Sequence, residues 1–129
     1  MSYIKHKSEE SMEDYLETIL ILTQRNGKVR SIDIVSELGY TKASVSVAMK
    51  GLREKKYITM DEVSYISLTD EGRELARKIL ERHTLLSNWL ICLGVSEEVA
   101  KEDACRIEHD ISDETFELLK KHYLEKTNM

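Results

Sequence analysis

The stretch that decides the fold of this chain reads Ser31-Ile-Asp-Ile-Val-Ser-Glu-Leu-Gly-Tyr-Thr-Lys-Ala-Ser-Val-Ser-Val-Ala-Met-Lys50. Ser31 can act as the N-cap of a short helix over residues 32–38, and Gly39 can end that helix because glycine readily adopts a positive φ. Thr41 can cap a further helix that extends to about residue 55, with apolar side chains at helical spacing. Two short helices joined by a tight turn predict a helix-turn-helix.

A β-hairpin is predicted directly after these helices. Residues 57–60 (Tyr-Ile-Thr-Met) and 64–68 (Ser-Tyr-Ile-Ser-Leu) are short runs rich in β-forming side chains, with Asp-Glu-Val between them. The connection lacks the Asn-Gly or Asp-Gly pair that is typical of tight hairpin turns. A helix-turn-helix followed by a hairpin is the arrangement of a winged helix, in which the hairpin forms a two-stranded wing.

The remainder of the chain is predicted to be helical, and the sequence contains no proline. A first helix, capped by Ser8 or Ser11, ends near Asn26-Gly27. A fourth helix runs from Thr69 to Gly94, a fifth from Ser96 through Asp110, and a sixth begins at Ser112. The fold class is therefore mainly α, with an N-terminal winged helix-turn-helix of three helices and a two-stranded β wing over residues 1–70. An all-helical domain follows over residues 71–129.

Composition narrows the class of protein. No stretch approaches the ~18 consecutive apolar residues of a transmembrane helix, and the first residues do not resemble a secretory signal. We therefore expect a cytoplasmic protein with no membrane association, and its two cysteines are too few for a disulfide framework. The net charge is −5, but residues 1–68 are neutral overall and residues 69–129 carry the whole excess of acid. A local cationic face for DNA is compatible with that distribution.

The helix after Thr41 is predicted to be the recognition helix of a DNA-binding domain. Its N-terminal half would present small and cationic side chains to the major groove, where lysines bind phosphate or guanine and serines permit a close approach. The alternative is that these residues form the solvated face of an ordinary helical domain. The predicted DNA-binding residues, including the two at the helix starts, are Ser31, Thr41, Lys42, Ser44, Ser46 and Lys50.

A set of possible metal ligands is spread over three predicted helices. Cys105, Glu108 and His109 are spaced i, i+3 and i+4, so they share one face of the fifth helix. Asp14 and Glu17 form an i, i+3 pair on the first helix, and His83 lies on the fourth. Each residue alone is more often a solvated or core side chain. Together they offer the nitrogen, sulfur and oxygen ligands of a transition metal, and their summed negative charge would be neutralised by divalent ions.

The chain resembles the diphtheria toxin repressor family, and within it the branch of manganese transport regulators. The resemblance covers nearly the whole chain and is carried by Ser11-Met-Glu-Asp-Tyr-Leu-Glu17, Arg82-His-Thr-Leu-Leu86 and Asp103-Ala-Cys-Arg-Ile-Glu-His109, with the winged helix between them. It implies a homodimer that binds Mn(II) or Fe(II) and then occupies palindromic operators of metal-uptake genes. Residues 71–129 would then be a metal-binding and dimerisation domain, without the SH3-like third domain of the longer members.

The ligands that the resemblance implies are Asp14, Glu17, His83, Cys105, Glu108 and His109. The manganese branch has a glutamate at the position of Cys105, whereas the iron branch has a cysteine there and a methionine at the position of Asp14. The iron branch also has a second site that uses a glutamate and a histidine where this chain has Ser87 and Lys101. The ligand set is thus a hybrid, and both the preferred metal and the number of ions, one or two, stay open.

The resulting hypothesis is a metal-dependent transcriptional repressor. Metal would tie the first helix to the fourth and fifth helices and thereby fix the spacing of two recognition helices in a dimer on double-stranded DNA. The alternative is a winged-helix regulator that responds to Co, Ni or Zn or to a signal other than a metal. An enzyme is not expected, because the sequence shows no general base or substrate-binding motif beyond the ligands themselves.

Overall fold

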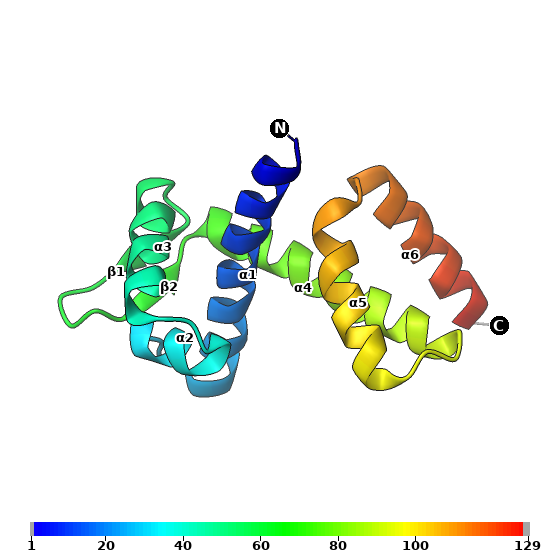
Figure 1. Ribbon diagram of the computed structural model, residues 1–129, viewed down its shortest axis with the longest axis horizontal. Coiled ribbons are helices and arrows are strands. Elements are labelled where there is room, and N and C mark those ends of the chain that lie inside the picture. The colour runs from blue at the N-terminus through cyan, green and yellow to red at the C-terminus, as the bar shows by residue number, and fades with distance from the viewer. Residues whose placement is uncertain (1, 128–129) are drawn as a thin grey trace. The chain divides into compact units, whose positions relative to one another are not determined.

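The computed structural model describes the backbone of residues 2–127 and the side chains of residues 12–127. Over this range the chain forms a mainly helical fold with one antiparallel hairpin, which confirms the predicted fold class (Figure 1). The elements are α1 (Ser2–Asn26), α2 (Ser31–Leu38), α3 (Lys42–Glu54), β1 (Ile58–Met60), β2 (Ile66–Leu68), α4 (Asp70–Cys92), α5 (Glu97–Asp110) and α6 (Asp113–Thr127).

The chain divides into two compact units, an N-terminal unit of residues 1–78 and a C-terminal unit of residues 79–129. The division falls within α4, so this helix contributes one end to each unit. The domain boundary that the sequence predicts at residue 70 stays a prediction. None of the helices within the described residues is both long enough and apolar enough to cross a membrane.

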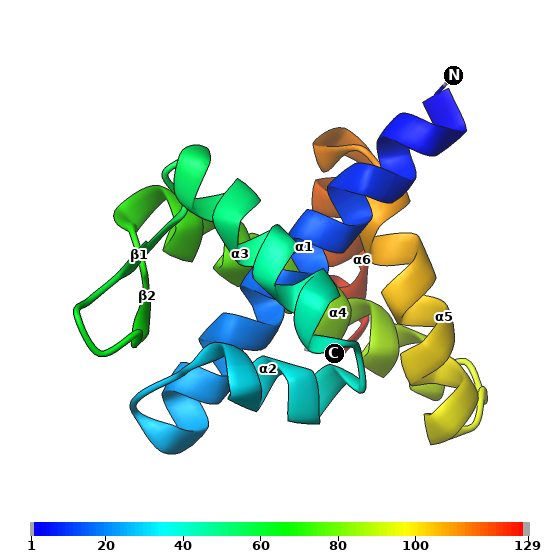
Figure 2. The ribbon, with the colours of Figure 1, turned by 60° about the vertical axis from the view of Figure 1, so that its left-hand side comes forward.

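In the N-terminal unit, α1, α2 and α3 pack around a common core, and the wing projects beside α3 (Figure 2). In the wing, β1 and β2 pair in antiparallel register with Thr59 opposite Ser67. The isolated bridge between Val29 and Ile66 joins the segment before α2 to the wing. The fully buried apolar side chains of this unit include Leu16, Ile19, Val29, Ile34 and Val45.

The turn between α2 and α3 forms as predicted. Gly39 has a φ of 70° and ends α2, with its N–H donating to the carbonyl of Val35. Thr41 caps α3 by accepting a hydrogen bond from the N–H of Ser44 at 3.1 Å. The two helices are therefore set by a left-handed glycine and a side-chain cap, which are the local signals that the sequence displays.

Two predicted helix starts are wrong. α1 begins at Ser2, so neither Ser8 nor Ser11 caps it; the preceding residues contain no proline or glycine that would stop the helix. Ser31 is the first residue of α2 rather than its N-cap, a position that Arg30 occupies. Asp33 explains the shift, because its carboxylate accepts a hydrogen bond from the Arg30 N–H at 2.9 Å.

The wing forms without the usual turn dipeptide because Asp61 organises the connection. Its Oδ1 accepts hydrogen bonds from the N–H groups of Val63 and Tyr65 at 3.0 and 2.9 Å. The start of α4 then packs closely on the beginning of the wing. A Cβ at Gly72 would lie 2.0 Å from the carbonyl oxygen of Tyr57, so only glycine fits there.

In the C-terminal unit, α5 and α6 form a helical hairpin (Figure 1). The N-terminus of α5 is capped by Ser96, and Ser112 accepts a hydrogen bond from the N–H of Thr115 at the start of α6. The core side chains of the unit, all less than a tenth exposed, are Ile79, Leu85, Leu86, Ala100, Ala104 and Phe116. This packing holds one face of α5 against α4.

Candidate metal centre and nucleic-acid interface

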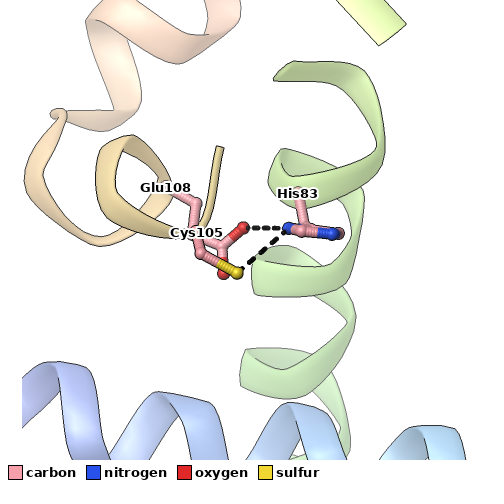
Figure 3. A group of neighbouring side chains, drawn as sticks. All are labelled: His83, Cys105 and Glu108. Carbon is pink, nitrogen blue, oxygen red and sulfur yellow. Dashed lines mark hydrogen bonds and ion pairs between the residues drawn. The ribbon is translucent and has the colours of Figure 1, made fainter. Parts of the chain in front are cut away.

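Three of the predicted metal ligands meet within the C-terminal unit. His83 projects from α4 toward Cys105 and Glu108 on α5 (Figure 3). The His83 Nδ1 lies 2.8 Å from Glu108 Oε2 and 3.8 Å from the Cys105 Sγ. One ligand atom of each residue lies within 4.8 Å of the others. The i, i+3 spacing places Cys105 and Glu108 on one face of α5, and the packing of α4 against α5 adds the imidazole.

The electrostatics of this cluster favour a cation. The Cys105 sulfur and then the Glu108 carboxylate, both beside the ring, raise the pKa of His83 to about 10. The metal-free ring is therefore protonated on both nitrogens at neutral pH, and its Nδ1–H faces the Glu108 carboxylate and the Cys105 sulfur. A metal ion bound to Nδ1 would replace that proton, because an imidazolium has no lone pair to offer.

Glu108 provides the test of whether the residues fit a metal. The side chain is fully buried, with a relative exposure of 0%. Its Oε1 has no hydrogen-bond partner among the described residues, although His109 Nε2 lies 3.3 Å away. A buried carboxylate with an unsatisfied oxygen is costly unless a cation neutralises it. With imidazole nitrogen and cysteine sulfur alongside, the donor set fits a divalent transition metal.

Arg82 holds the backbone of the cluster in place. This arginine is only 4% exposed, and its Nη1 donates to the carbonyl oxygens of Glu108 and Ile111 at 3.0 and 2.8 Å. Its Nη2 bonds the Asp113 carboxylate, and the guanidinium lies 5.2 Å from the centre of the Phe116 ring. One side chain of α4 thus joins the end of α5 to the start of α6, beside the residue that supplies the imidazole.

The other predicted ligands are placed as follows. His109 follows Glu108 on α5 and approaches its carboxylate. Asp14 and Glu17 lie on α1 in the N-terminal unit, where both are partly exposed. Their part in the metal centre stays a prediction. Ser87 is buried, and Lys101 forms an ion pair with Glu97 at 3.0 Å. A hydroxyl and an ammonium group thus stand where the resemblance would place the carboxylate and imidazole of the iron branch's second site.

The predicted DNA-reading residues lie on α3, at its N-cap and at the start of α2. A groove of about 580 Å³ lies along this helix and is open to solvent. The groove is lined by three of the predicted residues, Ser31, Ser46 and Lys50, and also by Arg53, Val47 and Met60. Val47 is 73% exposed, and an exposed apolar side chain at this position suits contact with the methyl group of a thymine.

Two of the predicted reading residues have a local structural role. The Thr41 hydroxyl donates to the Ser44 hydroxyl at 2.9 Å while accepting from the Ser44 N–H. Both side chains are therefore engaged in the cap of α3. Lys42 is exposed at the first position of the same helix. The binding of DNA by all six predicted residues stays a prediction.

Several residues of these sites escaped the sequence interpretation. Arg53 and Val47 share the helix face of Lys50, so helical spacing could have identified them. Arg82 directly precedes His83, but the sequence alone does not indicate that this arginine is buried. Tyr65 contacts Lys28 and Arg30 only because the Val29–Ile66 bridge brings two distant segments together.

Two family models match consecutive parts of the chain. Residues 7–64 match the model described as iron dependent repressor, N-terminal DNA binding domain. Residues 69–126 match the model described as iron dependent repressor, metal binding and dimerisation domain. The first contains α3 and its groove, and the second contains the cluster of His83, Cys105 and Glu108.

Relatives and solved structures agree with these matches. The transcriptional regulator MntR of Escherichia coli O6:H1 is 37% identical over 108 residues, which cover 84% of this chain and 70% of the relative. The structure of the manganese regulator SloR superposes with a TM-score of 0.77 at 28% identity, covering 86% of this chain and 52% of that one. A manganese-dependent transcriptional repressor in complex with manganese gives a TM-score of 0.75 at 26% identity, covering 87% and 52%. The chain thus spans about half the length of these solved chains.

Proposed function

The chain belongs to the iron-dependent repressor family and is a metal-dependent transcriptional regulator, and from this premise we propose that it is a homodimer that occupies palindromic operators when loaded with Mn(II) or Fe(II). The observation that carries the proposal is the close approach of His83 and Cys105 to the buried carboxylate of Glu108. The regulated genes would be those of metal uptake. The site of action is the cytoplasm, where the DNA lies, and no catalytic step is part of the function.

The metal ligands in this proposal come from three helices. His83, Cys105 and Glu108 supply the contacts within the C-terminal unit, and His109 adds a second imidazole. Asp14 and Glu17 on α1 supply carboxylate oxygens, as the resemblance to the manganese branch implies. The bound ion supplies positive charge that neutralises these acids and ties α1 to α4 and α5, with one or two ions present.

The switch acts through the position of two recognition helices. A dimer that reads a palindrome needs its two α3 helices about one DNA turn apart, roughly 34 Å. Metal raises operator affinity only to the extent that it binds the competent arrangement more tightly than the others. Exposed apolar side chains such as Leu93 and Val99, at 65% and 45% exposure, support an interface between the C-terminal units.

Cys105 decides which metal the site prefers. Thiolate is a softer ligand than carboxylate, so it moves preference from Mn(II) toward Fe(II), Co(II), Ni(II) or Zn(II). This supports a second candidate, in which the same repressor responds to one of these other metals. Replacing Cys105 by glutamate should move the rank of the metals toward Mn(II), and an unchanged rank would contradict the role of the sulfur.

The experiment that tests the function selects binding sites from a pool of random duplexes in the presence of Mn(II), Fe(II), Co(II) or Zn(II). The selected duplex is then bound by the full chain with each metal and with a chelator. The expected result is an inverted repeat that is bound at least about tenfold more tightly with the preferred metal, a coupling within the usual range. Equal affinity with metal and with chelator would overturn the proposed switch. A selected sequence without two-fold symmetry would overturn the palindrome.

A further inference from the structure

Two cations lie against a single aromatic ring at the base of the wing. The Lys28 Nζ is 4.8 Å and the Arg30 guanidinium carbon 4.4 Å from the centre of the Tyr65 ring. Lys28 and Arg30 are exposed, whereas the ring is partly buried. Distances under about 6 Å bring each cation within the attractive field of the ring face. We name these three residues the wing-base cluster.

The backbone beneath the cluster is fixed. The Ile66 N–H donates to the Val29 carbonyl oxygen at 2.7 Å, and Val29 itself is fully buried. Arg30 has the extended backbone angles φ −122° and ψ 165°. In an extended segment, residues i and i+2 point to the same side while the residue between them points to the other. Burial of Val29 therefore presents Lys28 and Arg30 outward together.

No carboxylate among the described side chains, residues 12–127, neutralises this pair. Among the residues that the structure describes, neither Lys28 nor Arg30 has an acidic partner within ion-pair distance. The nearest acid in sequence, Asp33, bonds the backbone N–H of Arg30 and so caps α2. Two adjacent cations held on a ring without a counter-ion form a surface that suits an anion with more than one charge.

The cluster is connected through the chain to the groove of α3. Arg30 precedes Ser31, which lines the groove of α3 together with Lys50 and Arg53. Arg30 is also the N-cap of α2, where the helix dipole adds positive potential. The segment at the start of α2 therefore links the wing-base cluster to the groove of α3 along the chain.

We propose that Lys28 and Arg30 bind backbone phosphates of duplex DNA next to the groove that α3 reads, with Tyr65 as the positioning residue that holds both cations outward. The proposal rests on the proposed function, because it takes the α3 face as the DNA face. The cluster would add affinity without adding sequence preference, since phosphates carry no base identity.

The test measures DNA affinity against salt for the full chain loaded with its preferred metal. The variants are Lys28→Gln, Arg30→Gln, Tyr65→Leu and Tyr65→Phe, and the matched control is Lys126→Gln, which removes one exposed positive charge from the end of α6. Fluorescence anisotropy measures the affinity of each protein for a random-sequence duplex and for the selected operator. Thermal melting checks that each variant folds like the wild type.

Lys28→Gln and Arg30→Gln should each lower the slope of log affinity against log salt concentration by about one, the value for one lost phosphate contact. The loss should be equal on the two duplexes. Tyr65→Leu should weaken binding to both, and Tyr65→Phe should restore it because phenylalanine keeps the ring face. Lys126→Gln should keep the wild-type slope.

Two results would overturn the inference. One is a wild-type slope in both charge variants, and the other is a loss confined to the selected operator, which would indicate base recognition instead. The proposed function can fail separately. If metal leaves operator affinity unchanged while the charge variants still lose slope on random DNA, the repressor switch is wrong and the phosphate contact stands.

Discussion

The two units place their functional charges in opposite environments. In the C-terminal unit Glu108 is fully buried and Arg82 is 4% exposed, and each depends on neighbours from another helix. In the N-terminal unit the lysines of α3, together with Lys28 and Arg30 of the wing-base cluster, are exposed to water. A buried charge is coupled to everything around it, whereas exposed charges act nearly independently. Substitutions should therefore have large, coupled effects in the C-terminal unit and small, additive effects in the N-terminal unit.

The largest expected effect is that of Glu108→Gln. The amide keeps the volume of the buried side chain but removes the negative charge of Glu108, which would attract and bind the metal cation. We expect Mn(II) affinity, measured by calorimetry, to fall by more than about 100-fold, beyond the range found for residues that only support a ligand. The control is Glu102→Gln, on the exposed side of the same helix, which should change little. Unaltered affinity in Glu108→Gln would remove this carboxylate from the metal centre.

Arg82→Met should follow in size. The variant keeps an apolar stem but leaves the carbonyls of Glu108 and Ile111 without their donors. We expect a loss of about 3 kcal/mol in the free energy of unfolding, the scale of hydrogen bonds that involve a charge. Metal affinity should fall about 10- to 100-fold because the backbone that carries Glu108 is released.

Arg106→Met is the matched control for this arginine, because the Arg106 side chain is 79% exposed on α5. It should leave both the melting curve and the metal titration close to wild type. A lower stability of Arg82→Met with wild-type metal affinity would mean that Arg82 only joins the helices and does not position the ligand.

Metal binding should also depend on pH through His83. Its pKa, raised to about 10, means that the metal-free ring carries a proton through the neutral range, and the metal must displace it. Affinity should therefore rise with pH, by at least about tenfold per unit between roughly pH 6.5 and 8.5, because the metal displaces the His83 proton and any proton on the Cys105 sulfur. Calorimetry in buffers of different ionisation enthalpy should show about one proton released from this ring. A flat pH profile would show that the metal does not replace the His83 proton.

The sequence predicted best what local rules determine. The Gly39 turn, the Thr41 cap and the wing follow from short-range conformational preferences, and the spacing of Cys105 and Glu108 places them on one helix face. The approach of His83 to them depends on how α4 packs against α5, which no local pattern specifies. The grouping of His83 with Cys105 and Glu108 was predicted from the family resemblance and not from helix packing.

The missed features depend on contacts between distant segments. Tyr65 meets Lys28 and Arg30 through the bridge between Val29 and Ile66, whose register no turn signal reveals. The true start of α2 was missed because a carboxylate three residues inside the helix competes with a serine at its edge. Long-range pairing and competition between caps are thus the two places where local reasoning stops.

The smallest expected effect is that of Lys50→Gln in the groove of α3. One exposed cation lost from a DNA surface should weaken operator binding by about tenfold or less and lower the salt slope by about one. Metal affinity should stay at the wild-type value, and the double variant with Lys42→Gln should show the sum of the two single effects on a logarithmic scale. Anisotropy and calorimetry on the same samples measure both quantities. A change in metal affinity would show that the exposed charges are coupled to the buried cluster, and the contrast between the two units would then describe burial alone and not function.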